Sequence, residues 1–174
     1  MKLFKLGGLA VCVLAAASVC AAQDVVSVVH GTVTKVDSAT KTVVVKSADG
    51  TEHTIKVTAD TTVKGTKAGF DGLAKGTEVV ARTTGKGADE TGVEIGKVGK
   101  DSYKVTKGTV TKVDEGTKTV VVKTADGTEK TFEYTDDAGK DMGKAVGKGT
   151  VKGTKVTVYY TEESGKKVAH FLGF

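Results

Sequence analysis

Short runs rich in valine, isoleucine and threonine recur along the chain, separated by turns that contain glycine and aspartate. β-Branched side chains fit the half-buried surface of a pleated sheet, so these runs favour strands. In the first half of the chain they predict strands at 28–36, 42–46, 54–57, 78–83 and 93–98. The Gly- and Lys-rich connection 58–76 is predicted to contain one helical turn at 70–74.

Two local signals refine the first three strands. Asp49-Gly50 lies between two β-branched runs and predicts a hairpin, because glycine supplies the positive φ of a tight turn. Val33 and Val36 are three positions apart, so both face one core only if the strand bulges near Thr34 or Lys35.

The same pattern is written twice. Residues 31–52 return as 108–129, with 19 of 22 positions identical, at a constant separation of 77. The second copy is expected to continue with strands at 156–160 and 168–172. A repeat of this kind indicates two copies of one structural unit.

Three meandering strands, a connection and a final hairpin are the order of a small closed barrel of the oligonucleotide/oligosaccharide-binding (OB) type. The chain is therefore predicted to be all-β, with two tandem five-stranded OB-like barrels at 23–99 and 100–174. A pair of sandwich-like sheets is the alternative. Units of about 75 residues bury little surface alone, so the barrels are expected to pack together or to share the strand-like link 100–107.

Residues 1–22 have the layout of a secretory signal peptide. Lys2 and Lys5 precede an apolar stretch that ends in small residues, and cleavage is expected after Ala21 or Ala22. The apolar stretch of 17 residues is short for a membrane anchor. A lipoprotein would use Cys20, but Val19 is bulky for the position before a lipidated cysteine. The expected location is therefore periplasmic or extracellular, with no transmembrane segment after cleavage.

The composition narrows the function classes. Both cysteines lie in the signal segment, so the exported chain has no disulfide, thiol nucleophile or thiolate metal ligand. Loss of Lys2 and Lys5 lowers the net charge from +5 to about +3, and Arg82 is the single arginine. The lysines alternate with acidic residues and threonines, which makes nucleic acid an unlikely partner.

Candidate chemistry differs between the two copies. His30 aligns with Lys107, His53 with Lys130, and His170 with Ile95 if a two-residue difference in the last hairpin is allowed. Metal and proton chemistry need groups that converge, and no carboxylate, His or Cys stands at ligand spacing beside these residues. No catalytic, cofactor or metal residue is therefore assigned.

Two other motifs have simpler structural explanations. Asp37, Asp49, Asp114 and Asp126 lack the ligand spacing of a calcium loop and suit Asx turns. The segment 143–150 resembles a phosphate loop only superficially and is predicted to be a flexible linker.

The aromatic residues give the one candidate ligand face. If Val156, Val158 and Tyr160 face inward, Tyr159 faces outward beside strand-five neighbours such as Phe171. An exposed tyrosine flanked by lysines is how such barrels stack bases or sugars. A larger second core with one ordinary surface tyrosine explains the same residues.

The pattern Gly-Thr-Val-x-x-Val-Asp, Thr-Val-x-Val, Ala-Asp-Gly-Thr and x-Lys-Gly-Thr-x-Val resembles a bacterial secreted β-barrel domain of unknown function, often found in tandem in exported proteins. The layout is also similar to the periplasmic OB-fold stress proteins and the copper-chaperone barrels. The resemblance implies compartment and fold but no activity. The copper chaperones' methionine pair and stacking tryptophan have no counterpart here, where the exported chain has only Met142.

The sequence thus predicts an exported, non-enzymatic binding or structural module of the cell envelope, with an unknown envelope protein or polymer as partner and no cofactor. One alternative is a weak binder of polyanions or glycans that uses Tyr159. The other is a periplasmic metal-binding protein that uses His30, His53 or His170.

Overall fold

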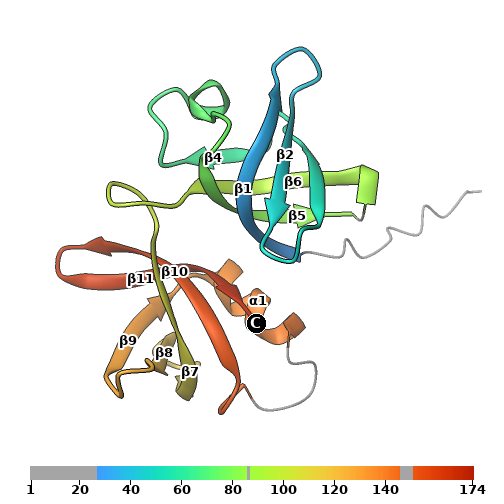
Figure 1. Ribbon diagram of the computed structural model, residues 1–174. Coiled ribbons are helices and arrows are strands. Elements are labelled where there is room, and N and C mark those ends of the chain that lie inside the picture. The colour runs from blue at the N-terminus through green and yellow to red at the C-terminus, as the bar shows by residue number, and fades with distance from the viewer. Residues whose placement is uncertain (1–26, 86, 146–150) are drawn as a thin grey trace, which may run out of the picture.

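The computed structural model describes residues 27–85, 87–145 and 151–174. They form two small β-barrels, one above the other in Figure 1, joined by the chain that leads into the second barrel. The predicted all-β class with two tandem five-stranded barrels is confirmed, and the sandwich alternative is wrong. The predicted signal peptide, residues 1–22, lies outside the described residues.

The first barrel has five strands that close into a ring and a sixth that extends it. Its elements are β1 (Ser27–Asp37), β2 (Thr42–Ser47), β3 (Glu52–Lys56), β4 (Thr62–Lys64), η1 (Gly69–Gly72), β5 (Glu78–Thr84), η2 (Gly87–Asp89) and β6 (Glu90–Lys97). The strand order is β3-β2-β1-β5-β6-β4, and a parallel pairing of β3 with β6 closes the ring. The expected helical turn in the connection is the 3₁₀ turn η1.

The second barrel repeats this layout with one change. Its elements are β7 (Lys104–Asp114), β8 (Thr119–Lys123), β9 (Glu129–Tyr134), α1 (Asp136–Ala145), β10 (Lys155–Glu163) and β11 (Lys166–Gly173). The closed order is β10-β11-β9-β8-β7. A helix, α1, stands where the first barrel has β4 and η1.

The helix corrects one prediction. The segment 143–150 was expected to be a linker, but Gly143 to Ala145 are the end of α1, and residues 146–150 lie outside the described part. Glycine weakens a helix, which is why the local sequence gave no helical signal. Ala138 and Met142 hold α1 in place because both are buried in the second core.

Both bulges occur where the valine spacing placed them. The register of β1 on β2 shifts between Val33 and Lys35, and that of β7 on β8 shifts between Val110 and Lys112. Because of the bulge, Val33 is buried in the first core and Val36 packs against it.

The strand register also corrects the alignment of the last hairpin. Arg82 pairs with Glu94 in the first barrel, and Tyr159 pairs with Phe171 in the second. The separation of 77 therefore continues through the last strands with no two-residue difference. Arg82 and Tyr159 are equivalent positions, and the equivalent of His170 is Val93 rather than Ile95.

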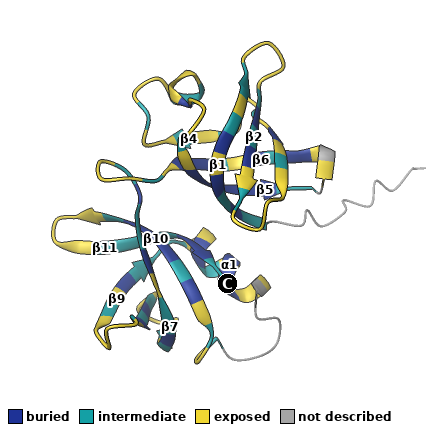
Figure 2. Ribbon diagram, viewed as in Figure 1, coloured by how far each residue is buried: buried dark blue, intermediate teal, exposed yellow. Residues whose placement is uncertain are grey.

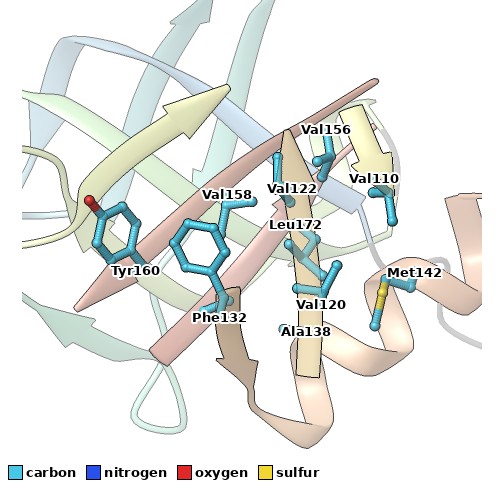
Figure 3. Packing of buried hydrophobic residues seen from close by; sticks show 11 residues of the cluster. Val110, Val120, Val122, Phe132, Ala138, Met142, Val156, Val158, Tyr160 and Leu172 are labelled. Carbon is cyan, nitrogen blue, oxygen red and sulfur yellow. The ribbon is translucent and has the colours of Figure 1, made fainter. Parts of the chain in front are cut away.

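Each barrel has its own core, and the dark blue stretches of the ribbon in Figure 2 mark the buried residues of both barrels. The first is built mainly from valines with Ile55, Leu73 and Ile95. The second is larger in its aromatic content, because Phe132 and Tyr160 stack edge to face at 5.0 Å (Figure 3). Each barrel therefore packs around its own hydrophobic core, and the contacts between the barrels are made by other residues.

Candidate functional site

The outer faces of the two barrels meet in a third apolar cluster, which we call the seam. Val80 of β5, Tyr159 of β10, Phe171 of β11 and Tyr103 of the link are all buried in it. β5 and β10 are equivalent strands, so the same face of each barrel forms the contact. The expectation that the barrels pack on each other is confirmed.

Arg82 is buried and forms ion pairs beside the apolar side chains of the seam. Its side chain is 5% exposed and donates two hydrogen bonds to Asp141 of α1, from Nε to Oδ1 at 3.2 Å and from Nη2 to Oδ2 at 2.7 Å. Nη1 donates to Glu94 Oε2 at 3.1 Å, and Nη2 also donates to the carbonyl of His170 at 2.8 Å. The guanidinium lies 4.6 Å from the centre of the Phe171 ring.

Burial and ion pairing shift the pKa values of Arg82 and Asp141 in opposite directions. Burial alone would lower the pKa of Arg82, but the hydrogen bonds and charge of Asp141, followed by the charge of Glu94, outweigh it and raise that pKa. Burial raises the pKa of Asp141, and the contacts with Arg82 work against that rise. The guanidinium is therefore held charged between two carboxylates, which fixes the second barrel on the first.

Tyr103 extends the same network. Its hydroxyl donates to Glu94 Oε1 at 3.0 Å, and Lys64 Nζ lies 2.9 Å from the same oxygen. Burial, with the nearby Glu94 charge, raises the pKa of Tyr103, so the phenol stays protonated. The ring lies across β6 at Gly96, where a Cβ would come within 2.1 Å of it. Glycine at this position is therefore required by the seam.

A groove of about 820 Å³ opens at one end of the seam, and we call it the seam groove. Its walls carry apolar and small polar side chains together with His30 and three lysines. The lining residues are Val28, His30, Lys107, Gly108, Thr109, Thr111, Lys123, Thr124, Ala125, Lys155, Val156, Thr157, Tyr159, Gly173 and Phe174. Among these described residues there is no Asp or Glu.

The three lysines are placed by strand pairing. Thr109 of β7 pairs with Lys123 on one side and with Lys155 on the other. Lys107 lies two residues earlier on β7, so its side chain points to the same face. All three are exposed, and none forms an ion pair with a residue that the structure describes.

His30 borders the groove from the first barrel. Its Nε2 lies 2.7 Å from Glu78 Oε1, and its ring centre lies 5.2 Å from that of Tyr159. His30 and Tyr159 therefore form the contact between the two barrels at the groove.

The structure corrects the expected exposure of Tyr159. Tyr159 and Phe171 do face outward from the second barrel and lie beside each other, but they are only 2% and 0% exposed because the first barrel covers them. Tyr159 still lines the groove, whereas Phe171 stacks on Arg82. A ligand contact by either residue stays a prediction. The residue whose role sequence reasoning missed was Arg82, and the signal that could have found it is its equivalence with Tyr159 in the repeat.

The three histidines lie in different settings. His30 pairs with Glu78, His53 Nδ1 lies 3.0 Å from Glu90, and His170 Nε2 lies 2.9 Å from the Thr161 hydroxyl. Within the described residues no group of three or more His, Cys, Asp or Glu side chains could hold a metal ion. The structure therefore does not bring together the histidines proposed for a metal.

The repeated aspartates form turns, as predicted. Asp37 and Asp49 accept hydrogen bonds from backbone N–H groups two or three residues later, at 3.0 Å. Asp114 and Asp126 do the same in the second copy, at 3.0 and 3.1 Å. These carboxylates are used by the turns.

A second hollow, of about 620 Å³, is more polar than the seam groove. It is lined by Tyr103, His170 and charged side chains that include Lys104 and Glu162. Lys104 pairs with Glu162, and burial, followed by the charge of Lys64, lowers the pKa of His170. Because the carboxylates of Asp101, Glu162 and Glu163 line this hollow together with its lysines, it offers less to an anion than the seam groove.

Comparison with known proteins gives little about this site. No family model matches the chain, and no curated protein matches it. Among solved structures, the crystal structure of Ag(I)CusF is 16% identical, and the match covers 40% of this chain and 93% of that one with a TM-score of 0.33. At that TM-score the likeness says nothing about a ligand of the present chain.

No helix in the described part of the chain has the length and apolar character needed to cross a membrane.

Proposed function

We propose that the protein is an exported, non-enzymatic binding protein of the cell envelope, and that the seam groove binds an anion. The observation that carries this is the charge of the groove. Three lysines without ion pairs to described residues share one face, and no acidic side chain is among the groove's lining residues.

These three lysines differ from others on the surface because they share one face beside a hollow that no acidic side chain lines. Other lysines without an ion pair to a described residue, such as Lys67, Lys75 and Lys97, line none of the hollows described above. Lys104, Lys118, Lys140 and Lys166 each pair with a carboxylate. In the groove an anion would take the place of that missing partner. A solvent-exposed ion pair contributes roughly 0–1 kcal/mol, so the lysines alone give weak, salt-dependent binding.

The side chains of the same groove also support a binding role over an enzymatic one. His30 is the one histidine among the lining residues, and its Nε2 lies 2.7 Å from Glu78 Oε1. The other polar side chains that line the groove are lysines, threonines and Tyr159, which provide no activated nucleophile beside that histidine. Binding is therefore the better-supported class.

The experiment is an amide NMR titration of the exported chain with pyrophosphate at low and high salt. We expect shifts centred on Lys107, Thr109, Lys123 and Lys155, with affinity that falls as salt rises. The variant K107Q/K123Q/K155Q should lose these shifts.

The matched control is K67Q/K75Q/K97Q, which removes three exposed lysines of the first barrel that line none of the hollows described above. It has the same net charge as the groove variant and should bind like the wild type. Equal loss in both variants, or shifts scattered over the surface, would mean that only the net charge attracts anions.

A further inference from the structure

We infer that the anion of the seam groove is the head group of an amphiphile with a single alkyl or acyl chain. This rests on the proposed anion site and names the class of molecule that fits the rest of the groove. Three features carry it: a compact lysine cluster, an apolar wall with an exposed phenylalanine, and a tyrosine hydroxyl at the groove that has no hydrogen-bond partner among the described residues.

The three lysines form a compact triangle and do not follow one another in a line along the surface. Neighbouring strands are about 4.8 Å apart, so Lys123 and Lys155, on either side of Thr109, lie about 10 Å apart at the backbone. Lys107 lies about 7 Å along β7 from Thr109. Lysine side chains span such distances, so one phosphate or carboxylate could contact all three. A polymer would need charges that continue along the surface.

Next to this triangle the groove is apolar. Val28, Val156, Ala125 and Phe174 line it, and Phe174 is 41% exposed. Within the described residues, Phe174 and Val93 are the two large hydrophobic side chains classed as exposed. A volume of about 820 Å³ is within the range of about 300–1,000 Å³ of sites that enclose a small molecule.

Tyr159 supplies the third feature. The residue is 2% exposed and lines the groove, yet its hydroxyl has no hydrogen bond with any described residue. A hydroxyl in this position can donate a hydrogen bond to an acceptor oxygen of a bound head group, at the junction of the apolar and charged parts of the groove.

The test is calorimetry of the exported chain with hexyl, octyl and decyl phosphate below their micellar concentrations. Affinity should rise about fourfold for each methylene that the groove buries. Inorganic phosphate should bind more weakly than any of them. Octanol, which has the chain without the charge, should bind more weakly than octyl phosphate.

Three variants locate the effect. Phe174→Ser should reduce the dependence on chain length, while Val93→Ser, which removes an equally exposed side chain outside the groove, should leave it unchanged. Tyr159→Phe should weaken head-group binding about threefold to tenfold without lowering the unfolding midpoint, because the hydroxyl lost has no hydrogen-bond partner among the described residues.

The outcomes separate this inference from the anion site itself. If pyrophosphate binds at the three lysines but affinity is the same for all chain lengths, the amphiphile is wrong and the anion site stands. If a sulfated polysaccharide binds far more tightly per charge than decyl phosphate, the ligand is a polymer. If none of these anions binds at the lysines, or a dimer of the chain buries the groove at working concentrations, both proposals fail.

Discussion

Among single residues, Arg82 makes the largest set of polar contacts that join the two barrels. Its planar guanidinium donates to two carboxylates and a carbonyl and stacks on Phe171. Lysine has neither the fork nor the stacking plane for these contacts. This explains why the chain's single arginine stands at the seam, whereas lysine serves for the surface.

Arg82→Ala should destabilise the protein by about 3–5 kcal/mol, because it leaves the buried carboxylate of Asp141 without its partner. Urea unfolding measures this. Lys64→Ala, which removes a more exposed partner of Glu94, should cost about 1 kcal/mol or less. Similar losses in the two variants would show that the seam is not held by this ion pair.

The turn aspartates give a pH dependence. Backbone hydrogen bonds from Thr40 and Thr117 lower the pKa of Asp37 and Asp114 below 3.8, the ordinary value for an aspartate. A lowered pKa in the folded state means that the unfolded chain binds protons first as the solution is acidified. The stability from these turns is therefore complete above about pH 4 and is lost as pH falls through the folded pKa values.

D37N/D114N should accordingly lose less stability than the wild type between pH 5 and pH 3, because asparagine keeps an Asx turn without a titrating group. The midpoint of urea unfolding at several pH values measures this. D37A/D114A should be less stable already at neutral pH. A steep acid loss in the asparagine variant equal to that of the wild type would assign the pH dependence to other carboxylates.

At the scale of elements, β1 and β7 are bent strands that each pair on both sides. β1 pairs with β5 through its first half and with β2 through its second, and both pairings include Gly31. A Cβ at Gly31 would lie 2.2 Å from the carbonyl oxygen of Lys46, and one at Gly108 would lie 2.4 Å from that of Lys123. Glycine is therefore needed at these two positions, because the backbone of the neighbouring strand comes too close for a side chain.

Gly108→Ala should destabilise the protein by about 2–3 kcal/mol through this clash. Gly143→Ala lies in α1, where the added Cβ would have no atom of the described residues within 4 Å apart from the helix's own backbone and the two neighbouring residues. It should stabilise the protein by about 0.5–1 kcal/mol. Thermal unfolding of the two variants should shift in opposite directions. A shift in the same direction would mean that the corner relaxes without cost.

The features that could be predicted from the sequence are those set by residues near one another in the chain. The features that could not be predicted depend on contacts between distant residues. Strands, Asx turns and bulges depend on near neighbours, and the spacing of Val33 and Val36 was enough to place a bulge. The helix α1 depends on burial of Ala138 and Met142 in a core made elsewhere in the chain. The seam depends on pairs such as Arg82 and Asp141, 59 residues apart, and no local pattern relates them.

At the scale of the whole molecule, two separately cored barrels share one interface. Each core is complete within its own repeat, whereas the seam takes side chains from both. The seam groove exists only where the barrels meet, since Val28 and His30 come from one and Tyr159 from the other. Folding of each unit and formation of the site are therefore different events.

The fragment 101–174 should fold alone with a β-rich circular dichroism spectrum, because it contains the whole second core. It should be less stable than the full exported chain, because Tyr159 and Phe171 lose their cover and Asp141 loses Arg82. Urea unfolding compares the two. A random-coil spectrum for the fragment would show that the second barrel needs the first in order to fold.

The equivalence of Arg82 and Tyr159 has an evolutionary meaning. Newly duplicated units present identical faces, and either could replace the other. Here one copy holds the cation and the other holds the aromatic rings and the acidic group that receive it, so a chain with two first copies or two second copies could not form the junction. Divergence at a few surface positions has made the two faces complementary. Deletion of the first copy would expose Tyr159 and Phe171 and leave Asp141 without Arg82, and deletion of the second would leave Arg82 without Asp141.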